Sequence, residues 1–229
     1  MIKNIGQLFY KVIPKGKKTY TGMFIEKKFI KSLLPKNPVI VDCGAHYGLD
    51  TIELAAFENS SVYAFEPIKE VYKLLLENTN HWPNINCFNM ALSDFNGTAT
   101  MYKSSGGSDG SSSLLKPKIH LIDHPDVLFD QTEDVVVKTL DNWADETEVK
   151  HVDMLWLDMQ GAEQAMLMKS NKILSTVRII HTEVSTKETY EGVQHYKNFR
   201  RFLKQKGFEP IVEAIPDGYD MGNVLFIRK

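Results

Sequence analysis

The chain contains little cysteine: Cys43 and Cys87 are the only two among its 229 residues. Neither stands in a CxxC or CxxH pair, so the sequence predicts no zinc site. Both fall in or beside predicted buried strands, which is typical of reduced core thiols in an intracellular protein. We therefore expect a cytoplasmic location.

The sequence also lacks a long hydrophobic run and an excess of basic residues. The apolar stretch within the first 18 residues is too short for a membrane span or a signal peptide, and we interpret it as a short amphipathic helix. A formal charge of −2 provides no basic field for nucleic acid or an anionic membrane. We expect a small-molecule or glycan substrate and no nucleic-acid partner.

Short β-branched runs alternate with helical patterns from residue 37 onward. This alternation predicts an α/β fold with a parallel sheet covered by helices on both faces. The two closing strands are separated only by a turn, which predicts that they pair antiparallel and form an antiparallel edge. The expected strands cover 38–44, 61–67, 85–92, 97–104, a strand that starts at 133, 152–159, 177–184, 208–215 and 223–229. The expected helices cover 49–59, 69–82, 161–174 and about 190–206.

The sequence predicts one domain over residues 37–229, preceded by a helical extension over 1–36. The regular alternation of strands and helices is interrupted over residues 95–135, and this segment is expected to be an insertion at the rim of the sheet. Its Gly/Ser stretch "SGGSDGSSS" (105–113) is either a lid over the site or a disordered surface loop.

The stretch "VIVDCGAHYGLDTIELAA" combines a buried strand, an acid, two turn glycines and a helix. Its G-x-x-x-G spacing differs from the G-x-G-x-x-G that places a pyrophosphate on a helix N-terminus, which disfavours an NAD-dependent oxidoreductase. Asp42 precedes the turn, and Glu66 ends the next strand, where an acid accepts hydrogen bonds from ribose hydroxyls. The pattern favours a nucleoside without a diphosphate, such as S-adenosylmethionine. The alternative is ordinary turn glycines and a surface acid.

Several motifs in order carry a family resemblance: "VIVDCGAHYGLDTIELAA", "VYAFEP", "NMALSDFNGTA", "SSSL", "VKTLDNW" and "LWLDMQGAE". Over about residues 38–185 the chain resembles the FkbM-type S-adenosylmethionine-dependent methyltransferases. The resemblance implies a class I methyltransferase fold, a Rossmann-like three-layer sandwich with a mostly parallel seven-stranded sheet. It also implies methyl transfer, usually to a hydroxyl oxygen of sugars, polyketides or other metabolites.

The resemblance also implies which residues form the site. The methionine end of the cofactor would contact Asp42, Gly44, Ala45, His46 and Gly48, and the ribose would contact Glu66 and Pro67. The adenine would face Asn89, Ala91 and Asp94, while Ser112 and Ser113 would lie near cofactor or substrate. Asp158, Gly161 and Glu163 would form the substrate-side rim, with Asp158 also near the cofactor.

One position departs from the family pattern. Family members commonly read D-x-E-G-A-E where this chain has "DMQGAE", so Gln160 replaces a carboxylate. Glutamine hydrogen-bonds but cannot act as a base or a charged metal ligand. This departure keeps open a non-catalytic binding or assembly protein that retains the fold.

A hydroxyl acceptor needs a group that removes its proton. Asp158, at the end of a strand, is our first candidate for the base or substrate anchor. Glu163 is a further candidate, or simply a helix-start acid. His181 and Glu183 lie two residues apart on one strand face and are further catalytic candidates. His181 could accept the proton, although we favour a core histidine at that position. Asp158, Glu163 and Glu183 could together bind a divalent cation, but no spacing requires one.

Overall fold

Seven strands form the central sheet of the computed structural model, which describes residues 19–229. Their order across the sheet is β11-β12-β10-β9-β3-β4-β5. The strands are β3 (Val39–Cys43), β4 (Ser61–Phe65), β5 (Ile85–Phe88), β9 (Met154–Leu157), β10 (Ile179–Ser185), β11 (Phe208–Ala214) and β12 (Met221–Arg228). The amphipathic helix expected in the first 18 residues lies outside the described residues. No helix within 19–229 is both long enough and apolar enough to cross a bilayer.

The closing strands pair antiparallel, as the short connection predicts. β12 pairs antiparallel with both β10 and β11, while β3, β4, β5, β9 and β10 run parallel. β12 is therefore inserted between β10 and β11, and the outer edge belongs to β11, which runs in the same direction as β10. The expected antiparallel edge is confirmed, because the edge strand β11 pairs antiparallel with β12.

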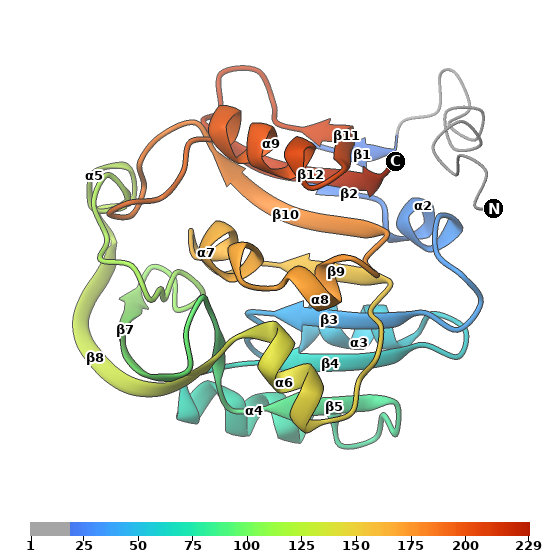
Figure 1. Cartoon of the computed structure of the whole chain (residues 1–229). Helices are drawn as coiled ribbons and strands as arrows, with labels where there is room; N and C mark the ends of the chain where they lie inside the picture. The colour runs from blue at the N-terminus through green and yellow to red at the C-terminus, as the bar shows by residue number, and fades with distance from the viewer. Residues whose placement is uncertain (1–18) are drawn as a thin grey trace.

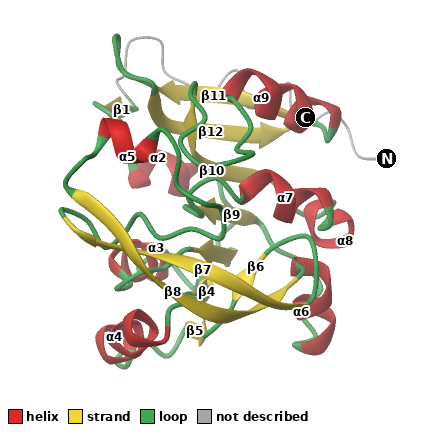
Figure 2. Cartoon of the chain, turned by 90° about the vertical axis from the view of Figure 1, so that its left-hand side faces the viewer, coloured by secondary structure: helices red, strands yellow, loops and turns green. Residues whose placement is uncertain are grey.

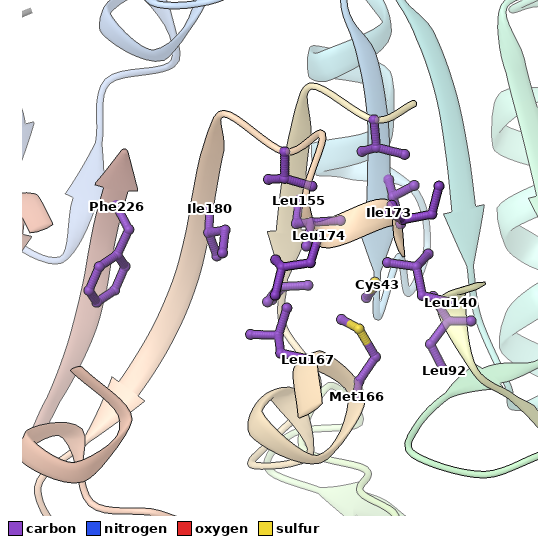
Figure 3. Close-up of a cluster of buried hydrophobic side chains, with 14 of the residues drawn as sticks. Cys43, Leu92, Leu140, Leu155, Met166, Leu167, Ile173, Leu174, Ile180 and Phe226 are labelled. Carbon is purple, nitrogen blue, oxygen red and sulfur yellow. The ribbon is translucent and has the colours of Figure 1, made fainter. Parts of the chain in front are cut away.

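Helices cover both faces of the sheet (Figure 1). One face carries α2 (Lys27–Ser32), α3 (Leu49–Ala55) and α4 (Lys69–Thr79), and the other carries α6 (Leu140–Glu146), α7 (Glu163–Met168), α8 (Asn171–Leu174) and α9 (Tyr196–Gln205). The side chains of β3 alternate between the two faces of the sheet. Val41 and Cys43 pack toward α6–α9, and Ile40 packs toward α2 and α3. Figure 3 shows side chains of α7 and α8, such as Met166 and Leu174, packed against the strands.

A second sheet lies beside the first, at the side where the parallel strands end. It contains β6 (Ala91–Leu92), β7 (Gly97–Gly106) and β8 (Val127–Lys138). The short helix α5 (His120–Asp123) lies between β7 and β8 in the chain. Figure 2 views the molecule from that side and shows β7 and β8 crossing in front of the central sheet. The segment expected to be a rim insertion therefore forms one wall of the space beyond the strand ends.

Several expected elements have different limits. The single strand expected over 85–92 is divided into β5 and β6, which belong to different sheets, because the chain turns at Asn89. The helix expected over 161–174 is divided into α7 and α8 at Ser170, whose hydroxyl donates to the carbonyl of Met166 (2.6 Å). β8 begins at Val127 instead of 133, and α9 begins at Tyr196 instead of about 190. The described part of the N-terminal extension contains strands β1 (Tyr20–Thr21) and β2 (Phe24–Ile25) besides α2.

Candidate active site

The turn after β3 is pressed against the end of β9. The backbone N–H groups of Gly44 and Ala45 both donate to the carbonyl of Phe65 (3.0 and 2.9 Å). Gly44 has φ +84°, and a Cβ atom there would lie 1.9 Å from the carbonyl oxygen of Asp158. Only glycine fits this position, because any side chain would both strain the backbone and collide with the neighbouring strand.

Glu66, at the end of β4, is only 5% exposed. One of its carboxylate oxygens accepts the backbone N–H of His46 (3.0 Å) and the other accepts that of Ile68 (2.8 Å). Burial raises its pKa to about 7. Each oxygen keeps a free lone pair, so the carboxylate can still accept hydrogen bonds from ligand hydroxyls.

These turns surround a cavity of about 220 Å³ beyond the strand ends. It is lined by the β3 turn, the β4 end, the β6 region and the β9 end, and is partly covered by the Gly/Ser segment. The predicted site residues on its wall are Gly44, Ala45, His46, Glu66, Pro67, Ala91, Ser112 and Asp158. The structure therefore brings together residues that are 114 positions apart in the chain, as expected for the carboxyl ends of adjacent parallel strands.

The Gly/Ser segment 105–113 forms an ordered cover over this cavity. Asp109 accepts a hydrogen bond from the Tyr47 hydroxyl, and its other oxygen lies 3.4 Å from Nε2 of His46. The Ser112 hydroxyl oxygen accepts the backbone N–H of Ser104 (2.9 Å). Of the two interpretations of this segment, the contacts favour a lid over a disordered loop.

Gln160 connects the acids near the end of β9. Its Nε2 donates to Oδ1 of Asp158 (2.7 Å) and to Oε2 of Glu183 (3.4 Å), and its Oε1 accepts from the hydroxyl of Tyr190 (3.1 Å). Desolvation by the surrounding protein raises the pKa of Asp158 to about 6, while its side chain stays accessible to solvent. Burial, together with repulsion from Asp158 and Glu163, raises that of Glu183 to about 8. Near neutral pH the negative charge of this pair therefore rests mainly on Asp158.

Glu163 holds the loop that leads into α7. Its Oε1 accepts the backbone N–H groups of Met159 (2.9 Å) and Gly161 (3.3 Å), and burial raises its pKa to about 7. These two hydrogen bonds fit the interpretation of Glu163 as an acid that stabilises the start of a helix. Asp158, Glu163 and Glu183 do not form a cation site: within residues 19–229, no group of three or more His, Cys, Asp or Glu side chains is placed to hold a metal ion.

His181 is not at the cavity, which corrects the expectation that it could accept a proton. Its ring stacks on Trp156 with centroids 3.6 Å apart and planes 8° apart, deep within the sheet. Burial lowers its pKa to about 3. His181 lies on the same face of β10 as Glu183 but two residues before it. It is therefore inside the sheet and does not reach the space beyond the strand ends.

Asp42 also does not line the cavity. It is 1% exposed, its Oδ2 accepts the hydroxyl of Thr51 (2.5 Å), and its Oδ1 has no partner in the described part of the chain. The expectation that Asp42 grips the ligand was wrong, because strand alternation directs it toward α3 along with Ile40. Four further predicted residues do not line the cavity: Gly48, Asn89, Asp94 and Ser113. Of these, Asn89 donates to the carbonyls of Glu66 and Pro67 (3.0 and 2.9 Å) and so holds the β4 end in place.

Several lining residues were missed by sequence reasoning. Ile68, Met90, Leu92 and Met101 provide apolar walls, and Asp109 closes the cover. Asp109 meets Tyr47 across 62 positions, and no local pattern signals such a pair. Ile68 could have been found because it directly follows the strand predicted over 61–67, and Met90 and Leu92 because they flank the predicted site residue Ala91.

The buried acids predict how stability depends on pH. In the folded protein the pKa values of Asp42, Glu66 and Glu163 are about 7, well above those of exposed acids. The folded state therefore binds more protons than the unfolded state, so unfolding free energy should rise as pH falls from 8 to 6.5, by roughly 1 kcal/mol for each group. Below about pH 6.5 the depressed pKa of His181 acts in the opposite direction.

Differential scanning calorimetry of the ligand-free protein at pH 8 and 6.5 checks this expectation. Asp42→Asn should reduce the difference between the two melting temperatures, whereas Asp145→Asn, at an exposed acid on α6, should leave it unchanged. A melting temperature that falls between pH 8 and 6.5 would contradict the assignment of raised pKa values.

The sequence is similar to known methyltransferases. The family model described as "Methyltransferase FkbM domain" matches residues 42–210. A curated protein from Sinorhizobium fredii, "2-O-methyltransferase NoeI", is 30% identical over 182 residues, which cover 77% of this chain and 75% of that protein. "AMB antimetabolite synthetase AmbE" from Pseudomonas aeruginosa is 25% identical over 91% of this chain, but the match spans only 11% of that protein.

Solved structures resemble the fold at low identity. An rRNA methylase from Streptococcus thermophilus matches with a TM-score of 0.54 at 12% identity, over 93% of this chain and 99% of that one. A putative rRNA methylase from Clostridium thermocellum matches with a TM-score of 0.50 at 14% identity, over 88% and 94%. The fold is that of the class I methyltransferases, as the motifs predict. The chain belongs to the FkbM methyltransferase family and is an S-adenosylmethionine-dependent methyltransferase.

Proposed function

We propose that this enzyme transfers a methyl group to a hydroxyl oxygen of a small molecule, sugar or glycan. The observation that carries the proposal is the position of Asp158, on the wall of the same cavity as Gly44 and Glu66. With a pKa of about 6, Asp158 is ionised at neutral pH and can accept a proton from a hydroxyl. The relative named a 2-O-methyltransferase supports oxygen as the accepting atom.

The residues of the cavity fit the cofactor. The free lone pairs of Glu66 suit ribose hydroxyls, and Ile68, Leu92 and Met101 offer an apolar wall for a purine ring. The acidic lining, which includes Asp50 and Asp158, suits a cationic ligand. When bound, S-adenosylmethionine supplies a methyl group activated by a positively charged sulfonium.

The chain itself must position the acceptor, exclude water and remove a proton. The cover held by Asp109 and Ser112 limits the access of water to the cavity. The 2.7 Å hydrogen bond from Gln160 fixes the orientation of the Asp158 carboxylate. Gln160 thus serves the site by orienting a base, which needs no charge at position 160, so replacement of the family carboxylate is compatible with catalysis.

The charge of the site supports a small molecule over nucleic acid. Asp50, Glu66, Asp109 and Asp158 line the first cavity, and no Lys or Arg of residues 19–229 does so. A polyanion would meet repulsion there instead of the basic surface that nucleic acid requires.

A cytoplasmic location also belongs to this proposal, supported by the unpaired thiols of Cys43 and Cys87.

Calorimetric titration with S-adenosylhomocysteine, the demethylated cofactor, tests the cavity directly. Glu66→Gln should weaken binding roughly tenfold or more, because the amide offers one acceptor oxygen to two backbone N–H groups and one of them loses its partner. Glu70→Gln, at an exposed acid on α4, is the matched control and should bind normally.

A radiolabelled methyl-transfer assay on a panel of hydroxylated acceptors then tests the reaction. Transfer that yields a methyl ether supports the proposal. Absence of S-adenosylhomocysteine binding to the folded protein at millimolar ligand, or methylation confined to nitrogen or carbon atoms, would reject it.

A further inference from the structure

The small net charge of the chain is the sum of two parts with opposite charge. Residues 1–36 contain nine lysines and one acid, Glu26, so their formal charge is +8. Residues 37–229 carry −10, and the total is therefore −2. The expectation that the chain provides no basic field holds for the chain as a whole, but the first part of the sequence is strongly basic.

Three lysines of this first part line a groove beside α2. Lys28, Lys31 and Lys36 surround a hollow of about 350 Å³. The groove also contains the ring of Phe57, and the Lys31 ammonium lies 5.9 Å from the centre of this ring. Pro38, directly before β3, lines the groove as well, so the groove lies where β3 begins, whereas the cavity proposed for the cofactor lies where β3 ends. Figure 1 shows α2 at the end of the sheet opposite β7 and β8.

The charge of these three lysines is not neutralised. Lys27 of the same helix is paired with two acids of α3, but no carboxylate of residues 19–229 lies within 4.0 Å of the Lys28, Lys31 or Lys36 ammonium. Glu58 also lines the groove and pairs with none of them. Residues 1–18 contain five more lysines and no acid, so they offer no partner either. All three lysines are exposed, and their charge is available to an anionic partner.

Lys150 extends this charge along the same end of the sheet. It is exposed, no carboxylate of the described residues lies within 4.0 Å of its ammonium, and it precedes β9. β9 begins beside β3, because the N–H of Asp153 donates to the carbonyl of Val39 (2.8 Å). Four lysines thus form the basic surface: Lys28, Lys31, Lys36 and Lys150. The acids of the cavity lie at the other end of the strands, and such a separation of charge orients a protein on an anionic surface.

Apolar side chains accompany the lysines. Phe24 lies three residues before α2 and is 77% exposed, and Tyr20, in the strand that pairs with that of Phe24, is 41% exposed. In residues 1–18 the sequence places apolar residues at helical spacing among its lysines: Ile2, Ile5, Phe9, Val12 and Ile13. A bilayer offers anionic head groups to the lysines and an interfacial layer to the aromatic and aliphatic side chains. A nucleic-acid duplex would take up only the lysines.

We propose that the basic surface binds the face of a phospholipid bilayer that contains anionic lipid, with the cavity turned toward the solution. Lysines near anionic head groups and apolar side chains in the interface each contribute to the affinity, and lasting attachment requires more than one such contribution. The binding does not involve the methyl acceptor. It therefore goes beyond the proposed function and is tested separately from it.

Co-sedimentation of the full chain with lipid vesicles measures this binding. In about 0.1 M salt, vesicles of phosphatidylcholine with about 30 mole per cent phosphatidylglycerol should bind the protein at least about tenfold more strongly than vesicles of phosphatidylcholine alone. In about 0.5 M salt this preference should fall severalfold, because screening weakens the attraction between ammonium groups and head groups.

The combined substitutions Lys28→Gln, Lys31→Gln and Lys36→Gln should weaken binding to the anionic vesicles by at least about tenfold and by up to about 100-fold. The reason is that each lysine near an anionic membrane surface contributes a factor of about five. The Kd for S-adenosylhomocysteine should not change, because none of the three residues lines the cavity. An unchanged Kd also shows that the variant is folded.

The matched control removes the same charge elsewhere. Lys73→Gln, Lys169→Gln and Lys197→Gln replace exposed lysines of α4, of the end of α7 and of α9, none of which has a carboxylate of the described residues within 4.0 Å. This combined variant should lose less than about threefold in vesicle binding. A loss as large as that of the Lys28, Lys31 and Lys36 variant would mean that only total charge matters, and the assignment of the basic surface would be wrong.

Phe24→Ser tests the apolar contribution. It should weaken vesicle binding about three- to tenfold, and the loss should persist in about 0.5 M salt because an apolar contact is not screened. Equal binding of the unaltered protein to both kinds of vesicle would overturn the proposal. Tighter binding to a DNA or RNA duplex than to anionic vesicles in the same buffer would assign the basic surface to nucleic acid instead. Failure to bind S-adenosylhomocysteine would reject the proposed function and leave the vesicle result as it stands.

Discussion

Asparagine in place of Asp158 should lower the rate of methyl transfer by roughly 10²- to 10⁴-fold, the usual contribution of a general base. The substitution keeps the size of the side chain and the carbonyl that faces Gly44, but it cannot accept a proton. Affinity for S-adenosylhomocysteine should therefore stay close to that of the unaltered protein. Steady-state kinetics with saturating acceptor, combined with calorimetry, measures both quantities.

The pH profile supplies an independent test of the same role. The pKa values of Asp158 and Glu183 are raised to about 6 and about 8, and Gln160 connects the two carboxyl groups. Activity of the unaltered enzyme should rise between about pH 5 and pH 7 as Asp158 loses its proton. Glu183 is protonated over this range, so Glu183→Gln leaves the charge beside Asp158 unchanged and should keep the midpoint of the rise close to that of the unaltered enzyme.

Asp145→Asn is the matched control for the substitution at Asp158. Asp145 is exposed on α6 and pairs with Lys172, so its replacement should change neither turnover nor cofactor affinity. If Asp158→Asn retained more than half of the normal rate, another group would have to remove the proton, and the proposed role of Asp158 would be wrong.

Local sequence patterns were enough to locate the turns of the site. Gly44, Glu66 and Asp158 each follow a short, mostly apolar run, and the carboxyl ends of adjacent parallel strands meet at one edge of the sheet. Because these strand ends meet at one edge, the three residues line one cavity. The order of the motifs along the chain was therefore enough to predict most of the cofactor-binding wall.

Two errors came from treating strand residues as if every polar one faced the site. Asp42 precedes the turn, but alternation directs it toward Thr51 and α3. His181 precedes the end of β10, and the parallel pairing with β9 places it opposite Trp156. A residue within a strand of the central sheet belongs to the layer that its parity selects, and the cavity is reached from that sheet by residues at the strand ends and in the turns that follow them.

The contacts between the insertion and the central sheet could not be located from the sequence. His120 and Gln164 are 44 positions apart and line one cavity because the insertion folds across the strand ends. Tyr190 reaches both the cover, through the carbonyl of Ser111 (2.8 Å), and Gln160. These contacts depend on how the second sheet packs on the first, and no periodicity within either segment specifies that arrangement.

Gly44→Ala should abolish measurable binding of S-adenosylhomocysteine, with a loss of affinity of at least about 100-fold, and should also destabilise the fold. The added Cβ would lie 1.9 Å from the carbonyl oxygen of Asp158, a backbone atom that belongs to the end of β9. The turn or the strand end must therefore move, and because both line the cavity, a shift of about 1 Å is enough to misplace the ligand contacts.

Gly218→Ala is the control that separates this collision from the cost of a left-handed backbone. Gly218 has φ +81°, nearly the φ of Gly44, yet a Cβ there would meet nothing within 4 Å. Its replacement should cost only about 1–2 kcal/mol of unfolding free energy and leave ligand binding unchanged. Gly44→Ala should lose more stability than this control in denaturant titration. If Gly44→Ala instead bound S-adenosylhomocysteine normally, the close approach of β3 and β9 would not be what shapes the cofactor site.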